Sequence, residues 1–154
     1  MQKFKVLDIS GDIGLTAYGR SKEEAFVHTA LGMYSLITNP DSIQEKKSVH
    51  ISVGSQSLDG LLVSWLNELI FHFDAYGFIG KKIIITAFIS SLTLPSQEGG
   101  RDDGEPFRLE ASIYGEEFDP ERHDGKLLIK AATYHRLRIE KSDDLWEIDV
   151  IFDI

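Results

Sequence analysis

The feature that most constrains the fold is the scarcity of helical periodicity in a chain rich in strand-like alternation. Two stretches repeat apolar side chains every three or four residues, the spacing of an amphipathic helix. Ser21, with Glu24 three residues later, is a capping box that predicts the start of the first helix, and Asn39-Pro40 predicts its end. Ser57 predicts the start of the second helix, which runs to about Asp74 with Gly77 and Gly80 closing it. Its buried stripe is Leu58, Leu61, Leu62, Trp65, Leu66 and Leu69.

The other apolar segments alternate with polar residues and predict β-strands. These segments are 3–8, 15–18, 46–53, 83–94, 107–114, 127–132, 134–140 and 146–154. A turn is predicted over Gly11-Asp12-Ile13-Gly14, and another begins at Asp119-Pro120. Because the late strands follow one another through short links, they should pair mostly antiparallel. The pattern predicts an α+β fold with two main helices packed on mostly antiparallel sheets. A length of 154 residues predicts one domain spanning 1–154.

Composition narrows the class of protein further. The chain has no cysteine, which removes thiol chemistry and fits a reducing compartment. The segment MQKFKVLDIS has no apolar core and no small-residue cleavage site of the kind found in secretory signals. No apolar run approaches the ~18 residues that a membrane span requires. We therefore expect a cytoplasmic protein with no membrane partner.

The charge distribution disfavours direct nucleic-acid binding. The net charge is −9, and phosphate contacts require clustered Lys and Arg. Ten acidic residues and three arginines lie between Glu98 and Asp124, which gives that stretch a net charge of −7. It includes a predicted polar loop over Gln97–Glu105. Two interpretations remain open at this point: a solvated loop that aids solubility, or a surface that attracts a cation or a basic partner.

Three short segments carry the candidate functional residues. In the terminal IDVIFDI, alternation places Trp146, Ile148, Val150, Phe152 and Ile154 on the core face and Asp153 on the other. Two anions as close as Asp153 and the terminal carboxylate repel each other unless a cation or several donors lie between them. Asp153 is therefore either an ordinary surface carboxylate or a ligand for a hard cation such as Ca²⁺ or Mg²⁺. Asp8 and Asp12, in LDISGDIG, allow the same two interpretations, since Asp also caps turns locally. Lys130 and His135, in KAATYHRL, are surface charges or specific contacts.

Taken together, four blocks of sequence resemble the archease family along nearly the whole chain. They are LDISGDIGLTAYG followed by SKEEAF, LLVSWLNELIF, YGEEFDPERH, and KAATYHRL with the terminal VIFDI. The resemblance implies a small non-enzymatic accessory protein of the RtcB-type RNA-splicing ligase. That ligase joins RNA ends carrying a 2′,3′-cyclic or 3′-phosphate to 5′-hydroxyl ends. It uses GTP and a divalent metal to guanylylate a histidine of its own. Archease promotes that step and restores multiple turnover, so GTP belongs to the ligase and is not bound here.

The resemblance also implies a set of site residues. An acidic site for a divalent cation, Ca²⁺ or Mg²⁺/Mn²⁺, falls on Asp12, Asp153 and the terminal carboxylate of Ile154. Lys130, Asp8 and His135 fall at positions of functional contact with the partner. One position departs from the family, whose first block usually reads Asp-His-Thr-Ala-Asp. Here Ile9 replaces the histidine and cannot bind metal or donate a hydrogen bond from its side chain.

Two other classes of function compete with this interpretation. The first is a stand-alone metal-dependent hydrolase using Asp12, Asp153, Glu147 and His135, although no two-metal spacing and no nucleophile motif accompanies these residues. The second is a metal-independent interaction module that docks a basic partner through the acidic stretch 98–124. It predicts that replacing Asp102, Asp103 and Glu105 together abolishes binding while Asp12→Ala does not.

Overall fold

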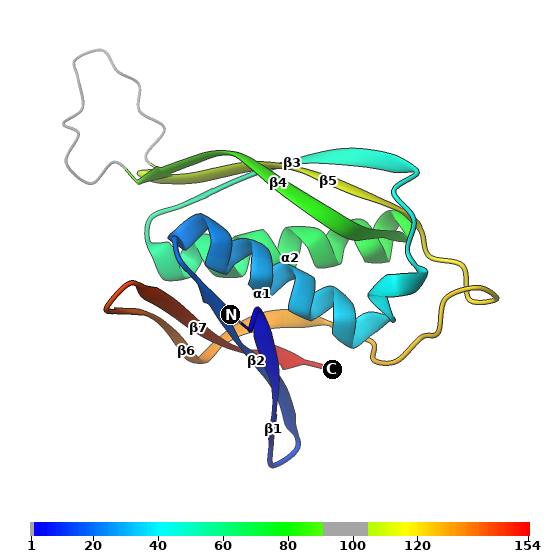
Figure 1. Cartoon of the computed structure of the whole chain (residues 1–154), viewed down its shortest axis with the longest axis horizontal. Coiled ribbons are helices and arrows are strands. Elements are labelled where there is room, and N and C mark those ends of the chain that lie inside the picture. Colours follow the sequence, from blue (N-terminus) through cyan, green and yellow to red (C-terminus); the bar gives the residue numbers. More distant parts are fainter. Residues whose placement is uncertain (1, 91–104) are drawn as a thin grey trace.

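A computed structural model describes residues 2–90 and 105–154 of the chain. Two helices lie between two antiparallel sheets (Figure 1), which confirms the predicted α+β fold with two main helices packed on antiparallel sheets. One sheet has the strand order β3-β5-β4, formed by Lys47–Ser55, Phe107–Glu117 and Phe78–Ser90 respectively. The other has the order β1-β2-β7-β6, formed by Phe4–Ile9, Asp12–Gly19, Leu145–Asp153 and Ala131–Ser142. The helices are α1 (Lys22–Ile37) and α2 (Leu58–Tyr76), and a single 3₁₀ turn, η1 (Pro40–Ser42), follows α1.

The helix ends follow the capping chemistry of the sequence. The Ser21 hydroxyl accepts a hydrogen bond from the Glu24 backbone N–H at 3.0 Å, and Ser57 accepts one from Gly60 at 3.0 Å. Each bond satisfies a backbone donor that the first helical turn leaves unpaired. Gly77 ends α2 in the left-handed conformation, with φ of 70°, which glycine adopts at little cost. The predicted starts of both helices are therefore confirmed.

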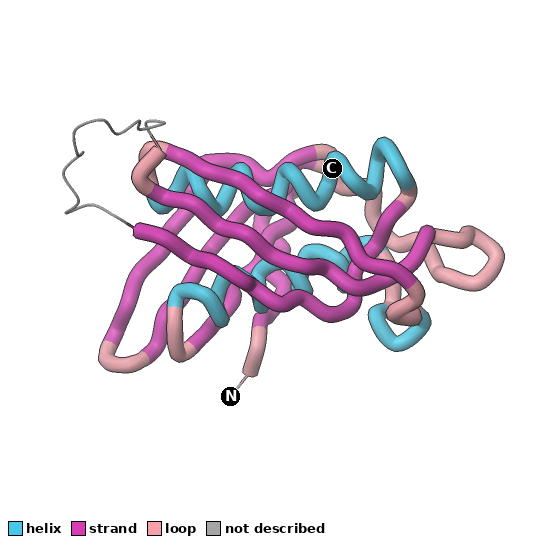
Figure 2. The backbone as a smooth tube through the Cα atoms, turned by 90° about the horizontal axis from the view of Figure 1, so that it is seen from above, coloured by secondary structure: helices cyan, strands magenta, loops and turns pink. Residues whose placement is uncertain are grey.

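The core lies on both sides of the helix layer, because each helix contacts both sheets. The predicted stripe of α2 is buried except at Leu58, which is only partly buried. Leu61, Leu62, Trp65 and Leu66 are fully inaccessible to solvent. The Trp65 indole N–H donates to the Phe26 carbonyl at 3.1 Å and ties α2 to α1. Figure 2 looks down on the β3-β5-β4 sheet, whose outward face is not covered by any helix of the described residues. Across the described residues, no helix is at once long and apolar enough to cross a membrane.

Three local predictions away from the first turn were wrong. The segments 127–132 and 134–140 are not two strands: residues 127–130 are irregular, and Ala131–Ser142 is one strand with a register break between Thr133 and Arg138. Gly80 does not close α2, because β4 begins at Phe78 directly after the Gly77 cap. Ile154 does not join the core face of the last strand and is 48% exposed, since it follows the final paired residue, Asp153. The predicted loop over Gln97–Glu105, with Asp102 and Asp103, lies outside the described residues except for Glu105.

Candidate functional site

Strand register brings the first turn, the KAATYH segment and the chain end together at one end of the β1-β2-β7-β6 sheet. The β2–β7 ladder ends at the pair Ile13 and Phe152, so Asp12 and Asp153 are the next residues of β2 and β7 beyond that end of the ladder. On the other side of β7, Asp153 pairs with Ala131, and its carbonyl accepts a hydrogen bond from the Lys130 backbone N–H at 2.8 Å. We call Asp12, Asp153 and the terminal carboxylate of Ile154 the carboxylate end.

The first turn differs from its prediction in a way that matters for this site. Ser10 and Gly11, with φ of 36° and 87°, form a two-residue hairpin turn, and Asp12 is already the first residue of β2. Asp12 therefore stands on a strand and does not cap the turn. Ile9 pairs with Asp12 across the hairpin. The residue that replaces the family's histidine is thus the direct cross-strand neighbour of Asp12.

Asp8 and Asp12 lie on opposite faces of the hairpin. Asp8 pairs with Ile13, and residues paired across an antiparallel ladder share a face. Ile13 and its partner Phe152 belong to the helix-covered face, whereas the neighbouring positions Asp12 and Asp153 belong to the outward face. Strand alternation therefore places Asp8 on the face of the hairpin opposite to the carboxylate end.

The carboxylate end fits a hard cation by its chemistry. Asp12, Asp153 and Ile154 are all exposed, and carboxylates held close together repel one another unless a cation or several donors lie between them. Ca²⁺ and Mg²⁺ favour such oxygen donors and complete their coordination with backbone carbonyls and water. Within residues 2–90 and 105–154, no three His, Asp or Glu side chains gather into a metal-binding group. A cation here would accordingly depend on two side chains supplemented by the terminal carboxylate.

The residues of the hydrolase hypothesis are not brought together. Glu147 lies six residues before Asp153 on β7, about 20 Å along an extended strand. Its carboxylate accepts a hydrogen bond from Arg138 Nη2 at 3.0 Å. His135 is exposed within the irregular part of β6, where its backbone N–H donates to the Thr133 hydroxyl at 3.3 Å. No common site joins His135 and Glu147 to Asp12 and Asp153.

Arg138 is the centre of a polar group that sequence reasoning missed. Its guanidinium donates to Asp149 and Glu140 at 2.9 Å and to Glu147 at 3.0 Å, and Thr16 donates to Asp149 at 2.7 Å. The bond to Asp149 is the largest of the effects that raise the pKa of Arg138. The sequence signal for this group was the placement of acidic and basic residues at alternate positions of the neighbouring strands β6 and β7. It stabilises the outward face of the sheet, and each of the three guanidinium nitrogens of Arg138 donates one hydrogen bond within it.

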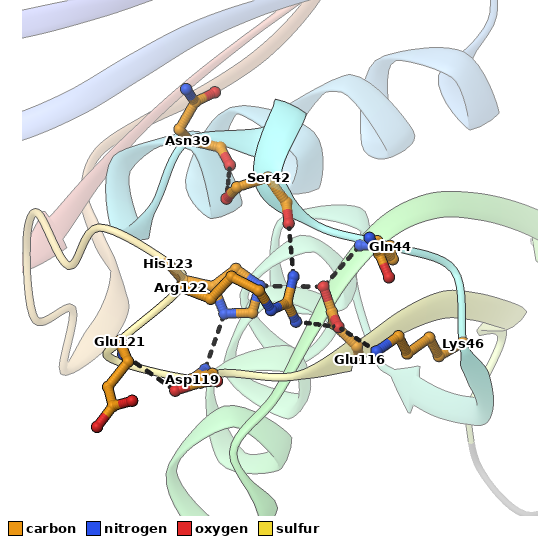
Figure 3. A network of polar contacts seen from close by, with 9 residues as sticks. All are labelled: Asn39, Ser42, Gln44, Lys46, Glu116, Asp119, Glu121, Arg122 and His123. Carbon is orange, nitrogen blue, oxygen red and sulfur yellow. Dashed lines mark hydrogen bonds and ion pairs between the residues drawn. The ribbon is translucent and has the colours of Figure 1, made fainter.

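The second missed group surrounds a buried carboxylate and is shown in Figure 3. Glu116, 3% exposed, accepts hydrogen bonds from Arg122 Nη2 at 2.5 Å and from the Gln44 backbone N–H at 2.7 Å. Lys46 lies 3.8 Å from the same carboxylate. His123, 1% exposed, accepts from the Asp119 backbone N–H at Nδ1, so its Nε2 carries the proton and donates to Glu116 at 3.0 Å. We call these residues the Glu116 network.

Burial and hydrogen bonding shift the pKa of Glu116 in opposite directions. Burial by itself raises the pKa of this carboxyl group, because it disfavours the charged form. The hydrogen bonds from Arg122, Gln44 and His123, with the charge of Arg122, outweigh burial and lower the pKa to about 2. Glu116 is therefore ionised at neutral pH. The sequence did carry a signal for this network. Arg122 and His123 lie six and seven residues beyond Glu116, across an Asp-Pro turn.

The Glu116 network holds the segment 118–130, which crosses from one sheet to the other. Arg122 also donates to the Ser42 carbonyl at 3.3 Å, which fixes the segment to η1. Further along, the backbone N–H groups of Lys126 and Leu127 donate to the carbonyls of Ile37 and Leu36 at the end of α1. The segment then reaches Lys130 beside Asp153. The network thus positions one of the three segments that meet at the carboxylate end.

Comparison with known proteins identifies the class of protein that has this fold. Residues 4–154 match the Archease protein family (MTH1598/TM1083). Protein archease of Pyrococcus furiosus is 33% identical over 155 residues, and that of Sulfolobus acidocaldarius is 30% identical over 154 residues; both comparisons cover all of each chain. The chain belongs to the archease family.

Solved structures agree with the fold. The solution structure of Methanobacterium thermoautotrophicum protein 1598 is 27% identical, with a TM-score of 0.80 and complete coverage of both chains. A Thermotoga maritima archease described as a possible chaperone is 18% identical, with a TM-score of 0.58 over 97% of this chain and 96% of that one. The second likeness concerns the fold alone.

Proposed function

We propose that this chain is a non-enzymatic accessory protein of an RtcB-type RNA-splicing ligase in tRNA splicing or RNA repair. It promotes guanylylation of the ligase by GTP, and thereby multiple turnover, with a divalent cation held at the carboxylate end. The observation that carries the proposal is the convergence of the first hairpin, Lys130 and the last strand at one end of a sheet. Membership of the archease family supports the choice of partner.

The chemistry assigns distinct roles to the residues at this end. Asp12, Asp153 and the terminal carboxylate would hold Ca²⁺, Mg²⁺ or Mn²⁺, and the cation would supply positive charge beside the ligase's nucleotide site. Lys130, exposed next to Asp153, would contact the ligase, together with Asp8 and His135. The protein touches the enzyme and not the RNA, which suits a net charge of −9. We place this role in the cytoplasm, where a cysteine-free chain meets reducing conditions.

A guanylylation assay tests the proposal. An RtcB-type ligase, labelled GTP and Mn²⁺ are incubated with the wild-type protein or with Asp12→Ala, Asp153→Ala or Lys130→Ala. The proposal predicts that the wild-type protein accelerates formation of the ligase–GMP adduct and that each variant loses most of that effect.

One matched variant separates the competing interpretation. The combined change Asp102→Ala, Asp103→Ala and Glu105→Ala removes charge from the acidic stretch 98–124. If this variant loses the effect while Asp12→Ala retains it, the protein is a metal-independent module that docks a basic partner. If no variant differs from the wild type, neither site mediates activation.

A further inference from the structure

The free edge of β3 differs from the other sheet edges of the molecule. In the described part of the chain, β1, β3, β4 and β6 are edge strands. The pairing of β4 is irregular at two places and that of β6 at one, which are common ways to block unwanted strand pairing. β1 has only six residues. β3 has nine residues, contains no proline and pairs with β5 in unbroken register, so its other edge offers a regular row of backbone groups.

Two hollows lie beside β3, where it packs against α2. The first has a volume of about 530 Å³ and is lined in part by Val49, His72 and Tyr76. The second has a volume of about 430 Å³ and is lined in part by Val53, Glu68 and Phe71. Val49 and Val53 are four residues apart on the same side of β3, which corresponds to about 13 Å along a strand. We call these two hollows with the β3 edge the α2–β3 groove.

Exposed aromatic side chains rim the α2–β3 groove. Phe71 is 51% exposed and Tyr76 is 59% exposed. Their rings contact each other edge to face, with centroids 6.0 Å apart, and Phe71 contacts His72 in the same way at 5.7 Å. Such mutually supported aromatic groups provide apolar contact area that is ordered before a partner binds.

Charge indicates what kind of segment the groove would accept. α2 carries Asp59, Glu68 and Asp74 and no Lys or Arg, so its exposed side is acidic. Glu68 lines the second hollow, while Lys47 and Glu117 balance each other at the first. A basic side chain is therefore favoured at the Glu68 end.

From this edge, these hollows and this charge, we infer that the α2–β3 groove binds an extended basic segment of a partner protein by strand addition to β3. The partner's backbone pairs with the β3 edge, two apolar side chains four residues apart enter the hollows, and a Lys or Arg faces Glu68. Strand addition obtains affinity from main-chain hydrogen bonds and specificity from pockets for alternate side chains. The inference does not depend on the cation at the carboxylate end.

Peptide binding to the whole protein tests the inference. The probe is a fluorescein-labelled nine-residue peptide in which Phe or Val alternates with Lys or Arg, followed by fluorescence anisotropy. A second peptide replaces every Lys and Arg with Glu. A third keeps the basic sequence but carries N-methyl groups on alternate amides, which remove the donors that a strand ladder needs. The inference predicts that the basic peptide binds at least about tenfold more tightly than either of the others.

Substitutions in the protein locate the binding surface. Phe71→Ser and Tyr76→Ser should each weaken binding of the basic peptide by about tenfold, and Glu68→Lys by about fivefold. Ile84→Ser is the matched control, because Ile84 is 42% exposed on β4 and does not line the groove. It should change the affinity by less than about twofold. Equal affinity for the basic and N-methylated peptides, equal weakening by Ile84→Ser, or no binding of the basic peptide would each overturn the inference.

Discussion

Replacing Glu116 with glutamine should destabilise the protein at neutral pH and remove part of its acid sensitivity. The folded pKa of Glu116 is about 2 against an ordinary value of 4.5. This difference corresponds to about 3 kcal/mol of unfolding free energy. Because Arg122 is 39% exposed and solvent screens its contribution, we expect a loss of about 2–3 kcal/mol in Glu116→Gln at pH 7.

The sign of the pH dependence follows from the direction of the shift. A carboxyl group whose pKa is lower in the folded state stabilises the protein fully above its unfolded pKa, here 4.5. That contribution is lost as the pH falls from 4.5 towards about 2. The wild type should therefore lose stability more steeply than Glu116→Gln over this interval, and the two unfolding curves should converge at low pH.

Urea denaturation at several pH values between 3 and 7, followed by tryptophan fluorescence, measures both effects. Trp65 is fully buried and reports the loss of the core. Glu117→Gln is the matched control, since Glu117 is the exposed neighbour of Glu116 on β5 and should change stability by less than about 0.5 kcal/mol. This role of Glu116 is refuted if Glu116→Gln is as stable as the wild type at pH 7. It is also refuted if the difference between them stays constant down to pH 3.

Further substitutions test other parts of the account. Leu62→Ala, at a fully buried position of α2, should lower the unfolding free energy by about 3 kcal/mol in urea titrations, because it leaves a cavity between the layers. Gly115→Ala should lower the unfolding free energy by about 2 kcal/mol or more, because its Cβ would lie 2.0 Å from the Ile79 carbonyl oxygen. Gly125→Ala should be tolerated, because the nearest contact of its Cβ would be at 3.6 Å. Equal thermal stability of these two glycine variants would contradict the β4–β5 packing. Arg138→Met should lower the melting temperature by a few degrees in low salt, with a smaller difference at 1 M NaCl, because Arg138 is 34% exposed and its ion pairs are screened. A difference independent of salt would contradict an electrostatic role for Arg138.

Sequence patterns were sufficient for the elements whose chemistry is local. Ser21 and Ser57 cap the two helices because a hydroxyl three residues before an unpaired N–H satisfies it whatever the tertiary surroundings. Strand irregularity could not be predicted in the same way. The break in β6 between Thr133 and Arg138 depends on how β6 pairs with β7, more than a dozen residues away in places, and Arg136 adopts a φ of 57° within it. Such non-local pairing leaves little trace in a local hydrophobic pattern.

In the candidate site too, local features could be predicted from the sequence and features that depend on strand register could not. The last-strand alternation correctly placed Asp153 away from the core and left it exposed. It could not show that Asp12 and Asp153 lie beyond the same end of the β2–β7 ladder, because that depends on the register between strands from the two ends of the chain. Nor could it find the Glu116 network, whose carboxylate lies in an alternating segment that reads as an ordinary strand end.

The measurement that tests the central claim most directly is calorimetric titration of Ca²⁺, Mg²⁺ and Mn²⁺ into the wild-type protein, Asp12→Ala, Asp153→Ala and Asp8→Ala. Asp8 is the matched control, because strand alternation places it on the face opposite to Asp12 and Asp153. We predict that at least one of the three ions binds the wild type and Asp8→Ala with similar affinity, while Asp12→Ala and Asp153→Ala lose most of that binding. Absence of binding to the wild type, or binding that survives in both Asp12→Ala and Asp153→Ala, would contradict a cation site at the carboxylate end.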